Sequence, residues 1–270
     1  MTGSTPQELL AIAIDVAREA ADTAYRMRAA GVEVAATKST ITDVVTAADR
    51  AVERQVLDTL ATIRPDDSVL GEEYGEGAPG ATGSGVRWIV DPIDGTVNYL
   101  YGLAHSAVSL AAEVDGVVVA GVVRNLFTGE EWTATLGGGA WRAGQRLRCS
   151  TETDLGQALV ATGFGYDAAR RSHQARVVAG LISHVRDIRR LGAAALDLCL
   201  AAEGRVDAYF EKGLAAWDQA AGGLVASEAG LRVAGLRGLP AGPDLVIAAP
   251  EALFGPLHDR LDDLDAAGGP

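Results

Sequence analysis

Two apolar runs joined by an Asp-Gly pair constrain the fold of this chain more than any other feature of its sequence. The runs cover residues 107–114 and 117–123, and the pair lies between them. Asp-Gly between two strand-like runs favours the tight turn of a β-hairpin, because both turn positions must tolerate a positive φ angle. Further apolar runs indicate strands at residues 69–70, 86–90 and 131–136. The sequence therefore predicts helices followed by a mostly antiparallel sheet in the first half of the chain.

The helices of the first half are predicted from caps and periodicity. A hydroxyl cap and a proline at residues 4–6 begin the first helix, and apolar residues at helical spacing continue to Ala30 before Gly31 ends it. The second helix is predicted from residue 46 to residue 63, with a proline shortly after it. Residues 75–85 are rich in Gly, Ala, Ser and Thr, and they predict a flexible loop.

From about residue 150 the pattern changes to alternating strands and helices, which is typical of an α/β fold. Strands are predicted at residues 158–162, 185–190, 206–210 and 245–249, and helices at residues 170–183, 193–202, 217–229 and 251–264. Residues 266–270 are expected to fray. We therefore predict an α+β half at residues 1–150 and an α/β half at residues 151–270. Because no linker composition separates the halves, they are expected to pack tightly.

Composition excludes several classes of function. The net charge of −13 argues against a nucleic-acid surface, and an anionic substrate would require bound cations in so acidic a protein. No run approaches the roughly 18 to 20 apolar residues that span a bilayer, and the first residues do not resemble a signal peptide. Cys149 and Cys199 are most simply free core thiols in a reducing compartment. A cytoplasmic protein that does not enter membranes is expected.

An acidic turn follows the strand predicted at residues 86–90. Asp91 and Asp94 lie on either side of Pro92 in this turn, and a Gly-Thr pair then begins a predicted helix. Because a residue before proline avoids the helical region, the strand is expected to end at Asp91, with its side chain at the sheet edge. Carboxylates followed by free backbone N–H groups are typical of a cation site beside an anion site.

Three further carboxylates occur at the boundaries of predicted elements: Asp49, Glu72 and Asp218. Taken singly, Asp49 could lie on a solvated helix face, Glu72 could belong to a loop, and Asp218 could simply favour a helix first turn. Together they indicate convergence at a sheet edge, where carboxylates would suit a hard cation such as Mg²⁺. The scattered histidines do not have zinc-ligand spacing, and neither a nucleophile elbow nor a nucleotide-binding glycine loop is present.

These motifs resemble the inositol monophosphatase family over almost the whole chain. The matching segments are Lys38-Ser39 with Asp43, residues 45–49, Gly71-Glu72-Glu73, Asp91-Pro92-Ile93-Asp94-Gly95-Thr96 with Asn98, residues 190–196, residues 207–211 and Trp217-Asp218-Gln219-Ala220-Ala221-Gly222. Residues 98–102 and 162–166 are similar to bacterial, especially actinobacterial, members. The two long motifs are highly specific in combination.

The resemblance implies an α/β fold in the form of a layered αβαβα sandwich, and a homodimer. It also implies Mg²⁺-dependent hydrolysis of a phosphate monoester by metal-activated water, with inhibition by Li⁺. Myo-inositol 1-phosphate is the expected substrate, while histidinol phosphate, fructose 1,6-bisphosphate and adenosine 3′,5′-bisphosphate remain alternatives because relatives acting on them share the metal site. A regulatory binding protein of the transcription or ribosome machinery is the alternative of another class. The intact acidic set and the net charge of −13 favour the enzyme.

The resemblance further implies roles for individual residues. Glu72, Asp91 and the Ile93 carbonyl would hold one Mg²⁺, while Asp91, Asp94 and Asp218 would hold a second, with Glu72 sharing a third. The catalytic groups that orient the attacking water would be Glu72, Thr96 and Asp49. The phosphate and the polyol would be bound by Asp94, Gly95, Thr96, Gly192, Ala193, Ala194, Glu211 and Asp218. Lys38 would lie near the site.

Glu211 is the residue of this set most able to recognise a polyol. A carboxylate can accept hydrogen bonds from two ring hydroxyl groups. The alternative is that Glu211 is a surface acid paired with Lys212 at the end of a strand.

Overall fold

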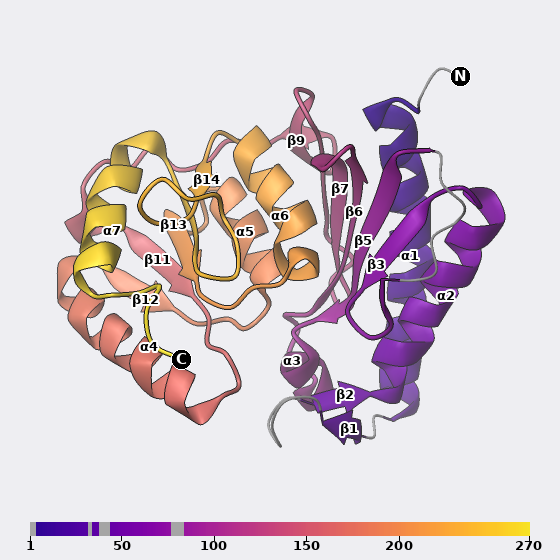
Figure 1. Cartoon of the computed structure of the whole chain (residues 1–270), viewed down its shortest axis with the longest axis horizontal. Coiled ribbons are helices and arrows are strands. Elements are labelled where there is room, and N and C mark those ends of the chain that lie inside the picture. Colours follow the sequence, from indigo (N-terminus) through magenta and orange to yellow (C-terminus); the bar gives the residue numbers. More distant parts are fainter. Residues whose placement is uncertain (1–3, 32–33, 38–43, 77–83) are drawn as a thin grey trace.

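Five layers of alternating helices and sheets form the molecule in the computed structural model, which describes residues 4–31, 34–37, 44–76 and 84–270. Figure 1 shows a helical layer outside each sheet and a third helical layer between the two sheets. The outer helices on the first sheet are α1 (Pro6–Ala30) and α2 (Ala47–Ile63), the central helices are α5 (Ala194–Ala202) and α6 (Ala216–Glu228), and those outside the second sheet are α4 (Ala168–Leu181) and α7 (Glu251–Asp263). The layered αβαβα sandwich is thus confirmed.

The first sheet has eight strands in the order β10-β9-β8-β7-β6-β5-β3-β4. They are β3 (Ser68–Gly71), β4 (Gly75–Glu76), β5 (Val86–Asp94), β6 (Ala107–Val114), β7 (Val117–Asn125), β8 (Glu131–Thr135), β9 (Gly139–Arg142) and β10 (Gln145–Arg146). All neighbours are antiparallel except β3 and β5. Asp115 and Gly116 have φ angles of 51° and 82°, which confirms the predicted hairpin turn between β6 and β7.

Strand β5 corrects the prediction that the strand ends at Asp91. It continues to Asp94, and its pairing with β6 shifts in register between Asp91 and Asp94. Pro92 has no N–H to donate to a neighbouring strand, and an irregularity in the ladder accommodates such a residue. The irregularity lies between the two aspartates, so Asp91 ends the regular part of the ladder and Asp94 follows the bulge.

Three other predictions for the first half change. Residues 75–76, which fall in the predicted flexible loop, form β4 against β3, and residues 77–83 lie outside the described residues. Strands β9 and β10 were not predicted, because the glycine-rich sequence before Trp141 gives little alternation. A small sheet of β1 (Val34–Thr37) and β2 (Val44–Thr46) also forms where only a loose stretch was expected.

The second sheet has the order β12-β11-β13-β15-β14. Its strands are β11 (Leu159–Thr162), β12 (Asp187–Arg189), β13 (Ala208–Glu211), β14 (Arg232–Ala234) and β15 (Val246–Ala249). The predicted strands are confirmed within a few residues, whereas β14 was missed. The first sheet ends at Arg146 and the second begins at Leu159, while the division into halves near residue 150 stays a prediction.

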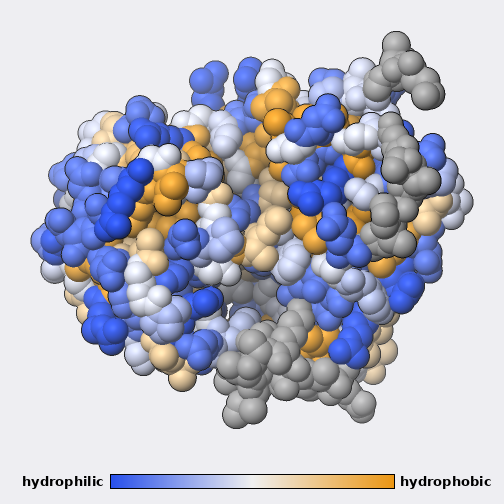
Figure 2. Space-filling model, viewed as in Figure 1, coloured by the Kyte–Doolittle hydropathy of each residue, from blue (hydrophilic) through white to orange (hydrophobic). Residues whose placement is uncertain are grey.

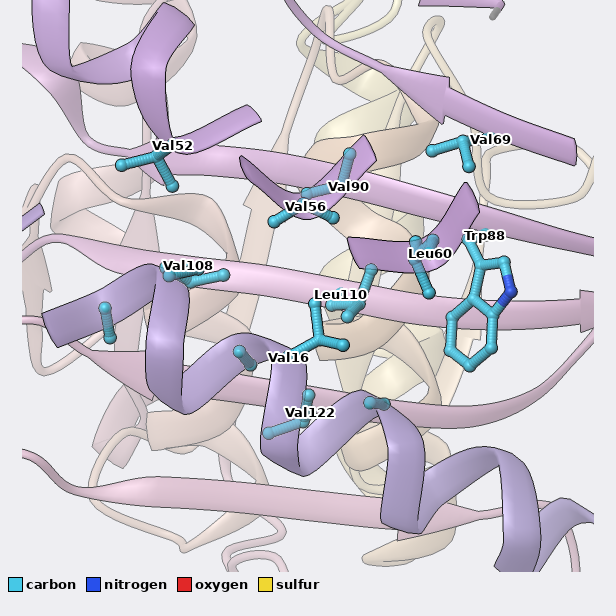
Figure 3. Packing of buried hydrophobic residues seen from close by; sticks show 14 of the residues in the cluster. Val16, Val52, Val56, Leu60, Val69, Trp88, Val90, Val108, Leu110 and Val122 are labelled. Atoms are coloured by element: carbon cyan, nitrogen blue, oxygen red, sulfur yellow. The ribbon is translucent and has the colours of Figure 1, made fainter. Parts of the chain in front are cut away.

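Apolar side chains from α1, α2 and the first sheet form one continuous core (Figure 3). Val52, Val56 and Leu60 recur along α2 at helical spacing and face Trp88 and other residues of the sheet. The buried indole N–H of Trp88 donates to Asp67 (2.8 Å), which satisfies both polar groups. This core fixes α2 on the sheet face, and so fixes the position of its first turn beside the end of β5.

A second core lies between the first sheet and the central helices, where α6 packs on β6 and β7. Figure 2 shows the surface hollowed where the two halves meet. Among the described residues, no helix is both long and apolar enough to cross a bilayer.

Candidate active site

Three aspartates from separate elements converge at the end of β5. Asp91 and Asp94 come from the bulge of β5, and Asp218 comes from the first turn of α6. One carboxylate oxygen of each residue lies within 4.8 Å of the others. Asp91 and Asp94 are buried and Asp218 is partly buried. The structure therefore contains the predicted acidic cluster. It brings the acidic turn at the end of β5 next to the first turn of α6.

Close packing of α6 on the sheet brings Asp218 to the cluster. Gly121 of β7 lies against Ala221, and a Cβ atom at Gly121 would be 3.0 Å from the Ala221 Cα atom. The Ser109 hydroxyl also donates to the Trp217 carbonyl (3.2 Å), immediately before Asp218. The small residues permit the approach, and the hydrogen bond fixes the first turn of the helix over the sheet.

Asp94 connects the acidic cluster to the other central helix. Its carboxylate accepts hydrogen bonds from the backbone N–H groups of Ala194 (3.2 Å) and Ala195 (2.8 Å), at the start of α5. An acid at this position satisfies otherwise unpaired donors and interacts favourably with the helix dipole. The Asn98 amide group, which lies 2.8 Å from both the His105 and the Leu191 carbonyl oxygens, donates to them and so provides a second link between the halves.

Thr96 and Asp49 lie together behind the cluster. Asp49 belongs to a capping box at the start of α2, in which its side chain accepts from the Thr46 backbone N–H (2.7 Å). The Thr96 hydroxyl lies 3.2 Å from an Asp49 carboxylate oxygen and 3.2 Å from the Ile93 carbonyl oxygen. Burial raises the pKa of Asp49 to about 6, against the lowering effect of the Thr46 hydrogen bonds. Asp49 is therefore not on a solvated helix face.

Gly95 is required by its backbone conformation and its neighbours. Its φ angle of 83° is strained for other residues, and a Cβ atom would lie 3.0 Å from the His105 carbonyl oxygen and 3.1 Å from that of Gly192. The glycine therefore allows β5 to turn directly into α3 (Thr96–Tyr101).

Glu53 positions the loop that carries Glu72, and sequence reasoning missed it. Its buried carboxylate accepts from the backbone N–H groups of Glu73 (2.8 Å) and Tyr74 (2.9 Å). Gly71 permits this approach, because a Cβ atom there would lie 2.0 Å from a Glu53 carboxylate oxygen. A usable signal was present, since Glu53 follows Asp49 by one helical turn on the otherwise apolar face of α2.

A cavity of about 400 Å³ contains the acidic cluster. Its lining comprises Glu72, Asp91, Ile93, Asp94, Gly95, Thr96, Phe164, Gly165, Tyr166, Asp167, Arg170, Arg190, Gly192, Ala194, Glu211, Lys212, Gly213, Leu214 and Asp218. Asp49 lies behind Thr96, and Ala193 is the buried cap residue of α5 and is not part of this lining. Lys38 lies outside the described residues. The lining cations and the aromatic residues 164 and 166 were not assigned roles from the sequence.

Glu211 lies in the wall of the same cavity. The Tyr209 hydroxyl donates to its carboxylate (2.7 Å), and burial raises the pKa of Glu211 to about 7. The carboxylate packs directly on Gly163, where a Cβ atom would lie 1.9 Å from one of its oxygens. The alternative pairing with Lys212 is wrong, because the Lys212 ammonium group donates to three backbone carbonyls elsewhere.

The electrostatics of the aspartates fit a divalent cation. Burial, together with the charges of neighbouring carboxylates, raises the pKa values of Asp91 and Asp218. Burial also raises the pKa of Asp94 to about 7. A cation among these oxygens would reverse the mutual repulsion, and an oxygen-only ligand set is the one that hard cations such as Mg²⁺ prefer.

The chain is similar to known proteins over nearly its full length. A sequence model described as the inositol monophosphatase family matches residues 5–263. An inositol-1-monophosphatase of Mycobacterium leprae is 44% identical over 261 residues, covering 90% of each chain. The Nus factor SuhB of Escherichia coli is 40% identical over 223 residues, covering 82% of this chain and 83% of that protein.

Solved structures agree with this similarity. Mycobacterium tuberculosis SuhB is 39% identical with a TM-score of 0.82, covering 98% of this chain and 100% of that one. A Thermotoga maritima IMPase is 28% identical with a TM-score of 0.85, covering 97% of this chain and 100% of that one.

Proposed function

The chain belongs to the inositol monophosphatase family and is a phosphatase, and from this premise we propose that it hydrolyses myo-inositol 1-phosphate with Mg²⁺ as its cofactor. The observation that supports this proposal most strongly is the composition of one cavity. Three converging aspartates occupy it together with Glu211, a carboxylate able to accept hydrogen bonds from ring hydroxyl groups. The products are myo-inositol and inorganic phosphate.

The proposed cation ligands come from both halves of the chain. Glu72, Asp91 and the Ile93 carbonyl would hold one Mg²⁺, and Asp91, Asp94 and Asp218 would hold another, with Glu72 sharing a third. When bound, the cations neutralise the phosphate and lower the pKa of water so that it can attack at neutral pH. Asp91 is a proposed ligand of two of these cations, so both cation sites would depend on it.

Thr96 and Asp49 are proposed to orient the attacking water. The pKa of about 6 leaves Asp49 mostly ionised at pH 7, so its carboxylate accepts the hydroxyl hydrogen of Thr96. A lone pair on the Thr96 oxygen is then available to accept a hydrogen from the water molecule. This arrangement turns a lone pair of the water toward the phosphorus atom. The backbone N–H groups of Gly95 and Thr96 are proposed to bind the phosphate oxygens.

The polyol is proposed to bind at the opposite end of the cavity. Glu211 accepts from the Tyr209 hydroxyl, which leaves further lone pairs on its carboxylate for two ring hydroxyl groups. Gly192 and Ala194 have little or no side chain, and so they leave room for the ring.

The pH dependence of KM tests the role of Glu211. Because burial raises the pKa of Glu211 to about 7, the carboxylate gains a proton as the pH falls and loses acceptor capacity. We expect KM for myo-inositol 1-phosphate to rise about 10-fold between pH 8 and pH 6, the scale of a hydrogen bond to a charged group. Steady-state kinetics would measure this rise, and Glu211→Gln should have a high KM with a much flatter profile.

Ionisation of the substrate's phosphate affects the parent protein and Glu211→Gln equally. The difference between their two pH profiles of KM therefore reports the titration of Glu211 alone. Parallel profiles would contradict its proposed role.

A phosphate-release panel tests the proposed function directly. The panel contains myo-inositol 1-phosphate, histidinol phosphate, fructose 1,6-bisphosphate and adenosine 3′,5′-bisphosphate, each with and without Mg²⁺. The highest kcat/KM is expected for myo-inositol 1-phosphate, and only with Mg²⁺. A higher value for one of the other three would transfer the assignment to that substrate.

A regulatory binding function is the second candidate, and the names of relatives favour it. Several relatives at 38–40% identity are named Nus factor SuhB. A tagged form of the chain would be used to capture partners from the transcription and ribosome machinery. Specific capture together with no Mg²⁺-dependent release from any panel substrate would favour binding over catalysis.

A further inference from the structure

The last residues of the chain are bound to a cation of the active-site wall. Residues 266–270 were expected to fray, but the Lys212 ammonium group donates to the carbonyls of Ala267 (2.9 Å), Gly268 (2.6 Å) and Gly269 (3.1 Å). An ammonium group has three donors, so all of them are used by this segment. We call residues 265–270 the C-terminal strap.

Two residues of α4 hold the strap from the same side. The Arg170 Nε donates to the Pro270 carbonyl oxygen (3.1 Å), and the His173 Nε2 lies 2.8 Å from the Asp265 carbonyl oxygen. Buried Gln174, one turn after Arg170, accepts from the Gly165 N–H (3.0 Å) and lies 3.4 Å from the Lys212 carbonyl oxygen. The strap, α4 and the end of β13 therefore form one hydrogen-bonded unit behind the cavity.

Glycines allow the strap to lie this close. Gly269 has a φ angle of 75°, and a Cβ atom there would lie 2.7 Å from the His173 ring. Within the strap itself, a Cβ atom at Gly268 would lie 2.0 Å from the Asp265 carboxylate, so the glycine permits the turn that brings residues 267–269 to Lys212. Ala267 and Gly268 also line a separate cavity of about 510 Å³. Ala266 anchors the start of the strap in the core of the second sheet, and the contacts with Lys212 and α4 hold the residues that follow it.

The two cations are also part of the active-site lining, at its polyol end. Lys212 follows Glu211 directly, and Arg170 lies against Gly213, with its Nη1 2.7 Å from the position of a Cβ atom there. Lysine and arginine side chains with available donors are the usual ligands of phosphate groups in proteins. With the strap in place, Lys212 donates to carbonyl oxygens rather than to a ligand in the cavity.

We propose that Lys212 and Arg170 form a second anion subsite of the cavity, and that the C-terminal strap, which lies outside the cavity lining, takes the Lys212 donors that a phosphate group would otherwise use. The proposal rests on the proposed function, because it places the reacting phosphate at the aspartates and the polyol ring at Glu211. A second phosphate on the far side of the ring would then lie toward Lys212 and Arg170. With all three Lys212 donors used by the strap, such a phosphate lacks this cation and lies beside the Glu211 carboxylate. The strap thereby selects substrates with one phosphate over bisphosphates.

The double variant Gly268→Val/Gly269→Val tests the proposal without adding a charge. Valine at position 269 is strained because the backbone there has a positive φ angle, and the new side chains at positions 268 and 269 meet the Asp265 carboxylate and the His173 ring. We expect the ratio of kcat/KM for myo-inositol 1,4-bisphosphate to that for myo-inositol 1-phosphate to rise about 10-fold, equivalent to about 1.4 kcal/mol. Calorimetry with the bisphosphate should show tighter binding by a similar factor. Hydrogen exchange of the C-terminal peptide should be faster, because the Gly268 N–H now donates to Asp265.

Two further variants identify the origin of the change. Gly238→Val is the matched control, since Gly238 has a φ angle of 78° but no neighbour within 4 Å of a new Cβ atom. It should leave the ratio unchanged. Adding Lys212→Gln to the double variant should return the ratio most of the way to that of the parent protein.

Other results would overturn the proposal in distinct ways. If hydrogen exchange shows that the strap is released but the ratio of the two kcat/KM values is unchanged, then Lys212 and Arg170 do not bind the second phosphate. Unchanged protection of the strap would show that the glycine contacts do not hold it. Failure of the parent protein to hydrolyse the monophosphate would contradict the proposed function, while calorimetry would still test the anion subsite.

Discussion

Replacing Asp91 by asparagine is expected to lower turnover of myo-inositol 1-phosphate by about 100-fold or more, the scale of removing one preorganised electrostatic group. Asparagine has nearly the same shape, so the bulge of β5 should persist, while one negative charge is lost from both proposed cation sites. The side chain also accepts from the Ile93 N–H (3.0 Å), a hydrogen bond that the amide oxygen can retain. Steady-state kinetics at saturating Mg²⁺ would measure the loss.

Asp67→Asn provides a matched control for Asp91→Asn. Asp67 is likewise buried in the first half, but it accepts from Trp88 and Arg64 and does not line the cavity. Its replacement should lower the melting temperature and leave turnover of the folded protein near that of the parent. Near-parental turnover of Asp91→Asn at saturating Mg²⁺ would refute the assignment of Asp91 to the cation sites.

Removal of divalent cations is expected to abolish phosphate release and to destabilise the protein in a pH-dependent way. Without cations, burial raises the pKa of Asp94 to about 7 from its usual value near 3.8, and the pKa values of Asp91 and Asp218 rise as well. The folded state then binds more protons than the unfolded state, so its stability falls as the pH rises through this range. Mg²⁺ competes with those protons, and its stabilising effect should therefore increase with pH.

Thermal unfolding of chelated protein, with and without added Mg²⁺, would measure this effect at pH 5 and pH 8. The increase in melting temperature on adding Mg²⁺ should be larger at pH 8 by at least about 5 °C, given that 1 kcal/mol corresponds to about 2–4 °C for a chain of this size. Asp218→Asn removes one of the charges and should reduce the increase. An equal increase at both pH values, or full activity after chelation, would contradict cation binding at this cluster.

The sequence predicted those parts of the fold that depend on local patterns. The hairpin between β6 and β7 followed from one Asp-Gly turn, and the long helices followed from caps and apolar periodicity. Strand β14 and the bulge at Pro92 could not be predicted in this way, because each depends on the register of pairing with the next strand of the sheet, across a connection that has no hairpin-turn signature. Local propensity does not contain that information.

The candidate site was predictable where its residues belong to a compact motif. The acidic turn of β5 and the helix start at Asp218 each belong to such a motif. Glu53 was missed because its partners are backbone N–H groups, whose positions no sequence motif specifies. The attachment of Lys212 to the last residues was missed for the same reason, since its acceptors are carbonyl oxygens.

The bond between Asp94 and the start of α5 also bears on the order in which the protein is made. During synthesis, Asp91 and Asp94 leave the ribosome with the strands of the first sheet, long before α5 and Asp218 are made. Until then Asp94 lacks its backbone donors, and the acidic cluster lacks a member. A nascent chain that ends before α5 therefore does not contain the assembled cluster, and the protein acquires it only when α5 and α6 have packed against the first sheet.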